Sequence, residues 1–381
     1  MAELIWEGKT EEVCNDVVSM DVLDRHVGTG GRDGWFNKLI KGDNRLVLST
    51  LLNGDMRKGI EDVGGLKLIY IDPPFNTGRG FGVKVPLGGD SFEVGGYGDS
   101  WGGIDSFIAM IYERLILMRD LLAEDGSIYV HCDWRVNSYL KNILDEIFGP
   151  DHFRNELIWS YSGWRRADNN QFSRKHDTIY FYSANSTKWN YKGAYESWVP
   201  GYTIQELRSL DKGLDETGDF VIIDGQNIYL TDFMEGYIKN RKQSIKRDAN
   251  GQFVWADGRN TVKRYLKDVL VEGKAVDDVW DIRALTTSSN DRLGYDTQKP
   301  EELIYRFIEA SSNKGDLVAD FFCGSGTMAA VAEKLGRKWI CTDLGKFSIH
   351  TTRKRMIGVQ RQLKKDGKCC LGFEVLEVGD V

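Results

Sequence analysis

The sequence predicts an α/β fold with a largely parallel sheet, and three observations support this prediction. Strand and helix signals alternate through most of the 381 residues. The apolar run 66–71, Leu-Lys-Leu-Ile-Tyr-Ile, is typical of a strand buried on both faces. A glycine-rich turn at 323–326 stands between another apolar run and a helical pattern, which is the position where α/β folds bind their ligands.

The other expected elements are marked by the spacing of their apolar residues. Helices are expected where apolar residues recur at helical spacing, over 105–123, 136–148, 301–312 and 327–335. Further strands are expected at short apolar runs, over 127–132, 156–161, 178–182, 317–322 and 338–342. Between 186 and 278 the chain is polar, charged and aromatic without clean alternation, so we expect the α/β body to carry an irregular insertion there.

The composition is ordinary for a globular protein. Apolar residues make up 41% of the chain and charged residues 28%, and no apolar run is long enough to cross a bilayer. The first residues do not resemble a basic and apolar leader, so we expect a cytoplasmic protein with no membrane partner. The six cysteines show no paired C-x-x-C spacing and there is no histidine cluster, which argues against a metal site and against disulfides.

Charge is distributed unevenly along the chain. The net charge of −7 does not suggest a nucleic-acid-binding protein, yet residues 239–267 sum to +7 and residues 154–175 to +3, which leaves −17 for the rest. A basic insertion on an acidic body would direct DNA to one face. A charged run is more often only a solvated helix face, so this pattern supports DNA binding without establishing it.

Asp72-Pro73-Pro74-Phe75 follows the strand at 66–71 directly. The prolines stiffen the backbone and lack N–H groups, so the carbonyls around them stay available as acceptors. Asp72 can accept a hydrogen bond from an exocyclic amine, and Phe75 can stack on a flat ring. The alternative is a strand that ends in a rigid turn, which an isolated Pro-Pro pair would favour.

The glycine-rich turn Phe322-Cys323-Gly324-Ser325-Gly326 stands where a strand ends and a helix begins. Its glycines let a ligand approach the backbone. The next strand ends at Asp343, 17 residues after Gly326, where a carboxylate suits the two hydroxyls of a ribose. The chain has no G-x-x-x-x-G-K-[ST] phosphate loop, and Ala329 replaces the third glycine of the dinucleotide motif. We therefore expect an adenosine-bearing cofactor without a phosphate chain.

The two motifs together resemble those of the amino-group DNA methyltransferases, which modify adenine N6 or cytosine N4 and share a D/N/S-P-P-Y/F/W and an F-x-G-x-G motif. The first precedes the second by about 250 residues here, an order that resembles the β group and, within it, the modification subunits of type III systems. Three further stretches match the family: Gly42-Asp43-Asn44, 125–133 and Thr297-Gln298-Lys299-Pro300. The resemblance covers roughly residues 36–185 and 278–360.

The resemblance implies a Rossmann-like S-adenosylmethionine-dependent methyltransferase fold with a circularly permuted motif order and an inserted target-recognition region. The implied parts are an N-terminal extension (1–35), a catalytic half (36–185), the target-recognition insertion (186–278), a cofactor-binding half (279–360) and a C-terminal tail (361–381). Asn76-Thr77-Gly78 and the glycine-rich segment from Gly80 to Gly103 are expected to form a mobile loop over the pocket, in which Trp101 is a lid residue or simply a packing residue. Double-stranded DNA is the implied partner, and a separate restriction subunit and a homodimer are left open.

The resemblance also implies roles for individual residues. Around S-adenosylmethionine, it gives Phe322, Gly324 and Gly326 as the cradle, Asp343 at the ribose, Asp43 at the adenine ring, and Thr297, Gln298 and Lys299 at the methionine end. For Lys299 the alternative is a helix start that needs no ligand. The basic residues expected to bind DNA phosphates are Arg165, Arg166, Arg174, Lys175, Arg241, Lys242, Lys246, Arg247, Lys263 and Arg264.

The implied catalytic residues are Asp72, Pro73, Pro74 and Phe75. The amine nitrogen of adenine is a weak nucleophile because its lone pair is conjugated with the ring. If Asp72 and the Pro73 carbonyl each accept one N–H, the lone pair returns to the nitrogen, which can then attack the sulfonium methyl. The base must be flipped out of the duplex, Phe75 would stack on it, and no metal is required.

Three alternatives to an adenine N6 methyltransferase remain open. Asp at the first motif position favours adenine, whereas cytosine N4 enzymes often carry Ser there, so a cytosine enzyme is the main alternative. Methylation of a glutamine amide or of an RNA base is the second, although those enzymes usually place the glycine motif first. A DNA-binding module without activity is the third, and the two intact motifs argue against it.

Overall fold

The computed structural model describes most of the chain, in two compact units. It leaves out residues 1–3, 11, 31–33, 88–89, 100–101, 162–169, 200–201, 203, 231–245, 248–252, 258–259, 287–288, 290–291, 296 and 380–381. It describes only the backbone of residues 79–87, 90–99, 205, 246–247, 253–257 and 260–267. The larger unit comprises Met1–Lys192 and Asp278–Val381, and the smaller comprises Gly193–Asp277.

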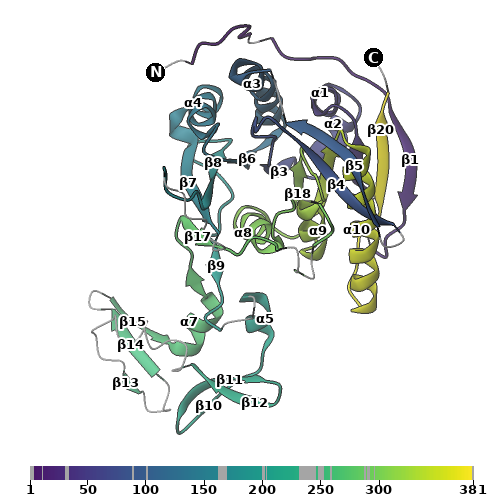
Figure 1. Ribbon diagram of the computed structural model, residues 1–381. Coiled ribbons are helices and arrows are strands. Elements are labelled where there is room, and N and C mark those ends of the chain that lie inside the picture. Colours follow the sequence, from purple (N-terminus) through teal and green to yellow (C-terminus); the bar gives the residue numbers. More distant parts are fainter. Residues whose placement is uncertain are drawn as a thin grey trace. The chain divides into compact units, whose positions relative to one another are not determined.

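The described part of the larger unit is built on one ten-stranded sheet (Figure 1). Its order is β1 (Met20–His26), β20 (Phe373–Val378), β2 (Asn37–Lys41), β19 (Lys338–Asp343), β18 (Leu317–Asp320), β3 (Leu66–Ile71), β6 (Leu122–Cys132), β8 (His176–Ser183), β7 (Phe153–Ser160) and β17 (Val279–Asp281). From β20 to β6 all neighbours are parallel. The α/β prediction is therefore confirmed, with antiparallel pairing added at β1 and β8.

The helices of this unit cover both faces of the sheet. They are α1 (Asn44–Asn53), α2 (Met56–Asp62), α3 (Ile104–Leu121), α4 (Asn137–Phe148), α8 (Glu301–Ser311), α9 (Thr327–Lys334) and α10 (Lys346–Lys365), with a short 3-10 helix, η1 (Pro150–His152). The alternation of side chains along β3 separates the faces, since Ile69 and Ile71 pack in one core with Phe107 of α3, whereas Tyr70 stacks on Phe307 of α8. In Figure 1, α8, α9 and α10 follow one another along one face.

Most predicted elements agree with the structure, and the differences have local causes. Helix α3 ends at Leu121, and β6 begins at the next residue because Leu122 already pairs with Leu66 across an irregularity in the register. Strand β18 ends at Asp320, since the backbone then turns and the Phe322 amide donates to the Asp320 side chain. The glycine-rich segment expected as a loop contains an antiparallel ribbon, β4 (Arg79–Leu87) and β5 (Asp90–Asp99), and Trp101 lies outside the described residues.

The two ends of the chain add strands to the sheet. β1 comes from the predicted N-terminal extension and β20 from the predicted C-terminal tail, and they pair with each other. β20 also pairs with β2 in parallel. None of the helices in the described residues combines the length and apolar character that a bilayer span needs.

The smaller unit has its own core, formed by Val199, Ile204, Leu207, Val221, Leu230, Val269 and Leu270. Its described strands form small antiparallel sheets: β9 (Tyr195–Glu196) with β16 (Lys274–Ala275), then β10 (Lys212–Asp215), β11 (Gly218–Ile223) and β12 (Gln226–Tyr229), and finally β13 (Lys246–Arg247), β14 (Phe253–Asp257) and β15 (Asn260–Tyr265). The described residues of this unit also include the helices α5 (Ile204–Ser209) and α7 (Leu266–Glu272). Its role in target recognition stays a prediction.

Glu333 on α9 joins several elements of the larger unit. Its buried carboxylate accepts hydrogen bonds from Asn37 Nδ2 at 2.9 Å, Trp339 Nε1 at 2.8 Å and the Leu371 amide at 2.9 Å. Burial raises the pKa of Glu333 to about 7, although these three donors oppose that shift. One side chain thus ties β2, β19 and the segment before β20 to α9.

We expect Glu333→Ala to lower the free energy of unfolding by about 3 kcal/mol, because three buried donors lose their acceptor. Chemical denaturation of both proteins measures this difference. Glu61→Ala is the matched control, since the Glu61 side chain is 57% exposed and its pair with Arg57 should contribute less than about 0.5 kcal/mol.

Because folded Glu333 holds a proton that the unfolded chain has lost, the stability margin of the wild type over Glu333→Ala should shrink as the pH rises from 4.5 through about 7. A margin that grows with pH over this range would contradict a raised pKa of Glu333 in the folded protein.

Candidate active site

A cavity of about 630 Å³ opens at the carboxyl ends of the central parallel strands. Its lining includes Asp43, Asp72, Lys299, Asp320, Gly324 and Asp343. These residues come from segments far apart in the chain, and the parallel order of β2, β19, β18 and β3 brings them to one edge of the sheet. The volume lies within the usual range for small-molecule sites, about 300–1,000 Å³.

The glycine turn after β18 requires its glycines. Gly324 and Gly326 have φ angles of +51° and +71°, in the left-handed region that side chains disfavour. A Cβ on Gly326 would lie 2.5 Å from the side chain of Thr352, so no larger residue fits. Phe322 and Gly324 both line the cavity, and the turn leads directly into α9.

Asp343, the last residue of β19, holds this turn in place. Its Oδ2 accepts from the Gly324 amide at 2.9 Å and its Oδ1 from the Gly345 amide at 2.8 Å. Burial raises the pKa of Asp343, and the two amides oppose this shift. Each carboxylate oxygen can accept a second hydrogen bond, which suits a pair of ligand hydroxyls.

Asp43 caps the first turn of α1. Its Oδ1 accepts from the Arg45 amide at 2.8 Å and from Arg114 Nη2 at 2.7 Å. Arg114, on α3, also donates to Asn44, whose Nδ2 donates to the Phe321 carbonyl at 2.8 Å. Arg114 was not predicted from the sequence, since a lone arginine in an amphipathic helix carries no signal. It connects α3 to both cofactor motifs.

Of the three residues predicted at the methionine end of the cofactor, two line the cavity and one does not. Thr297 and Lys299 line the cavity. Gln298 is buried, and its Oε1 accepts from the Leu293 amide at 2.8 Å, so it stabilises its own loop. Lys299 Nζ donates to Asp72 Oδ2.

The Asp-Pro-Pro-Phe segment leaves β3 at the rim of the cavity. Asp72 and Pro74 line the cavity, Pro73 is buried, and the half-buried Phe75 ring lies 5.9 Å from the His131 ring. Asp72 Oδ1 is buried and has no hydrogen-bond partner among the described residues. A buried acceptor without a donor is costly, and because Asp72 lines a cavity of ligand size, a ligand that reaches Oδ1 could supply that donor.

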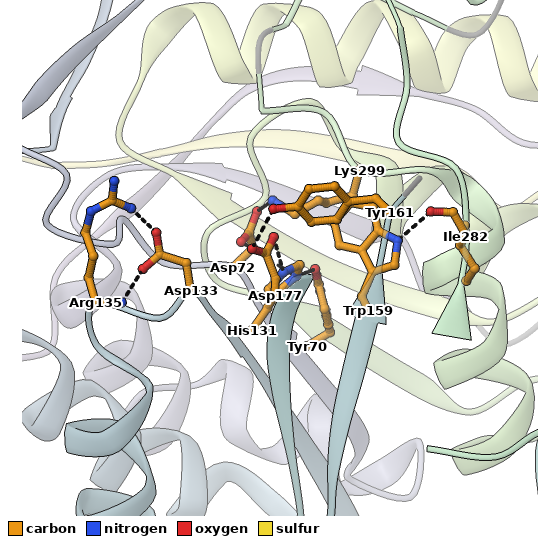
Figure 2. Close-up of polar contacts among 10 residues, drawn as sticks. All are labelled: Tyr70, Asp72, His131, Asp133, Arg135, Trp159, Tyr161, Asp177, Ile282 and Lys299. Carbon is orange, nitrogen blue, oxygen red and sulfur yellow. Dashed lines mark hydrogen bonds and ion pairs between the residues drawn. The ribbon is translucent and has the colours of Figure 1, made fainter. Parts of the chain in front are cut away.

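A chain of polar side chains lies behind Asp72 (Figure 2). The Tyr70 hydroxyl is 2.9 Å from His131 Nδ1, and His131 Nε2 is 3.2 Å from Asp177 Oδ2. The Tyr161 hydroxyl donates to Asp177 Oδ1 at 3.4 Å. Burial acts to raise the pKa of Asp177, but the hydrogen bond from His131 and the charge of Lys299 leave it lowered. Asp177 was missed in the sequence because it is distant from both motifs and enters through the antiparallel strand β8.

Only some of the predicted DNA-binding residues can be placed. The Arg174 guanidinium lies 3.7 Å from the centroid of the Trp134 ring. Arg174 and Lys175 lie just before β8. Arg165, Arg166, Arg241 and Lys242 lie outside the described residues, and only the backbone is described for Lys246, Arg247, Lys263 and Arg264. In the part of the chain with described side chains, no group of three or more His, Cys, Asp or Glu could hold a metal ion.

The residues of the cavity fit S-adenosylmethionine. The glycine turn leaves room for a ligand against the backbone, and carboxylates at Asp43, Asp72, Asp320 and Asp343 suit a cofactor that carries a sulfonium, an ammonium and two ribose hydroxyls. Burial raises the pKa of Asp320 well above its usual range, with the charges of Asp72 and Asp343 adding to the effect. A cationic ligand would relieve this repulsion.

Comparison with known proteins agrees with this geometry. The family model described as DNA methylase matches residues 66–354. The type II methyltransferase M.EcaI of Enterobacter cloacae is 30% identical over 84% of this chain and 69% of its own. The probable type III restriction-modification enzyme HindVI Mod subunit of Haemophilus influenzae is 26% identical over 80% of this chain, which spans only 48% of that subunit.

This chain is also similar to solved structures, among them an M1.HpyAVI–SAM complex and the cytosine-N4-specific PvuII DNA methyltransferase. The first match covers 84% of this chain and 98% of the other, the second covers 86% and 93%, and both have a TM-score of 0.45 and 14% identity. The family match confirms the resemblance predicted from the two motifs. This chain belongs to the DNA methylase family.

Proposed function

We propose that the chain transfers the methyl group of S-adenosylmethionine to the N6 amine of an adenine flipped out of double-stranded DNA, at a specific sequence. The observation that carries this proposal is at Asp72, whose buried Oδ1 has no hydrogen-bond donor among the described residues and whose side chain lines one cavity with the glycine turn and Asp343. An exocyclic amine would supply the missing N–H.

The cofactor, when bound, supplies a methyl group activated by the sulfonium. The residues that would hold it are the backbone at Gly324 and Gly326, Asp343 for the ribose hydroxyls and Asp43 for the adenine side. Thr297 remains a candidate for the methionine end, together with Asp320, which the sequence had not indicated. Apart from Gly326, these residues line the same cavity as Asp72, so both reactants would meet at one edge of the sheet.

The protein's part in the chemistry is to orient the amine. Asp72 and the Pro73 carbonyl would each accept one N–H, which returns the nitrogen lone pair to the side facing the methyl group. Phe75 would stack on the flipped base and offset part of the few kcal/mol of unstacking. Its half-buried ring is already held against the core and near His131.

Adenine is favoured because the motif begins with Asp, and cytosine N4 remains the second candidate because the matched family covers both bases. The names of the relatives support a role in restriction-modification, where a separate restriction subunit would be a partner. We infer that the smaller unit and its basic residues read the target sequence. A homodimer and a cytoplasmic location stay predictions.

We infer that Arg174 and Lys175 bind DNA phosphates near the site. Both precede β8, whose second residue is Asp177, and Arg174 is held against the partly exposed Trp134. An arginine supported by an aromatic ring is preorganised for an anion.

We expect Asp72→Ala to lower the methyl-transfer rate by at least ~10³-fold while the affinity for S-adenosylmethionine stays within about threefold. Single-turnover assays and equilibrium dialysis with labelled cofactor measure the two quantities. Asp62→Ala, on the exposed face of α2, is the control and should change neither. Normal turnover in the Asp72 variant would contradict the proposed mechanism.

Nucleoside mass spectrometry of DNA methylated by the protein should find N6-methyladenine. Long-read sequencing of DNA from a host expressing the chain should then give the modified position and its recognition sequence. N4-methylcytosine as the product would favour the second candidate, and the absence of any methylated base would contradict a DNA methyltransferase role altogether.

We expect Arg174→Ala to weaken DNA binding and to reduce the slope of log affinity against log salt by about 1, the value for one lost phosphate contact. Fluorescence anisotropy at several salt concentrations measures this slope. Lys188→Ala is the control, because Lys188 pairs with Glu124 near the opposite end of β6. An unchanged slope in the Arg174 variant would remove it from the DNA interface.

A further inference from the structure

The two oxygens of Asp72 have different environments. Oδ2 accepts a hydrogen bond from Lys299 Nζ, whereas Oδ1 has no hydrogen-bond partner among the described residues. The pair is largely buried, since the side chains of Lys299 and Asp72 are only 13% and 17% exposed. Buried and hydrogen-bonded ion pairs of this kind hold their geometry far better than surface pairs do.

His131 lies near Asp72 Oδ1 but forms no hydrogen bond with it. Its Nδ1 lies 3.8 Å from Asp72 Oδ1, which is too far for a hydrogen bond. The same nitrogen shares a hydrogen bond of 2.9 Å with the Tyr70 hydroxyl, and burial raises the pKa of Tyr70 well above its usual range. On the other side of the ring, Nε2 is 3.2 Å from Asp177 Oδ2.

The surroundings thus select one oxygen of Asp72 as the acceptor. His131 Nδ1 is engaged by the Tyr70 hydroxyl rather than by Asp72, and Lys299 donates only to Oδ2 (Figure 2). We propose that Lys299 is a positioning residue for Asp72, which fixes Oδ2 and presents Oδ1 to the amine of the target base. This inference rests on the proposed methyl transfer and deepens it.

The charge balance supports the same role. Lys299 also acts on Asp177 and Asp320, where its positive charge opposes the protonation that burial favours. Without Lys299, three carboxylates would share this region without that cation, and either oxygen of Asp72 could turn to the amine or to the sulfonium. The loss of Lys299 would therefore slow methyl transfer, because the acceptor oxygen is misplaced for attack, and would leave the affinity for the cofactor unchanged.

This role differs from the one that the family resemblance implies for Lys299, which is to hold the methionine end of the cofactor. A lysine that binds the cofactor should weaken cofactor affinity when it is removed. A lysine that positions Asp72 should instead slow the transfer step at saturating cofactor. The two roles therefore separate in one pair of measurements.

The experiment compares Lys299→Met and Lys299→Arg with wild type, and uses Lys334→Met as a control lysine that pairs with Glu301 on the surface. Equilibrium dialysis gives the Kd for labelled S-adenosylmethionine, and single-turnover assays at saturating cofactor give the transfer rate on DNA. For Lys299→Met we expect the rate to fall ~10²-fold with the Kd within about threefold, the loss typical of a misplaced reacting group. Lys299→Arg, which still donates to a carboxylate, should recover the rate to within about tenfold of wild type.

A Kd weakened tenfold or more in Lys299→Met, or a rate close to wild type, would overturn the inference. Thermal melting shows whether each variant folds; if the Met variant does not, the Arg variant decides, because a ~10²-fold loss of rate there would also overturn it. A wild-type protein that methylates no DNA would contradict the proposed function itself. Active wild type with a cofactor-binding defect in Lys299→Met would contradict only this inference.

Discussion

The parallel order of the central strands is the constraint on which the rest of the site depends. Five neighbouring strands, β2, β19, β18, β3 and β6, run in the same direction, so their carboxyl ends share one edge. Each of these strands ends at, or within two residues of, an aspartate: Asp43, Asp343, Asp320, Asp72 and Asp133. Such a row of carboxylates favours a cationic ligand and is unfavourable without compensation.

The protein compensates each of these aspartates in a different way. Asp43 pairs with Arg114 from α3, Asp72 with Lys299 from the loop before α8, and Asp133 with Arg135. Asp343 accepts two backbone amides, and Asp320 accepts the Phe322 amide while burial favours its neutral form. Only the Asp72 pair leaves a buried oxygen with no donor in the described residues, which is why this carboxylate is the one suited to receive a base.

The glycine turn adds backbone to the wall of the cavity. Gly324 lines the cavity without a side chain, and Gly326 has no room for one beside Thr352. Tyr70 and His131 are hydrogen-bonded to each other behind Asp72, and neither of them forms a hydrogen bond with Asp72 Oδ1. The site therefore combines a rigid backbone cradle with one oriented acceptor, an arrangement suited to a reaction that needs alignment more than acid or base strength.

The sequence by itself determined the α/β class, most elements of the larger unit, and the two motifs that identify the family. It could do so because apolar spacing reports burial, and because the glycines and prolines are required by local backbone geometry. Only the tertiary structure decided which charges meet. Three contacts of the site join residues that are distant in the chain: Lys299 with Asp72, Arg114 with Asp43, and Asp177 with His131. Such contacts follow from strand order and packing, which no local pattern encodes.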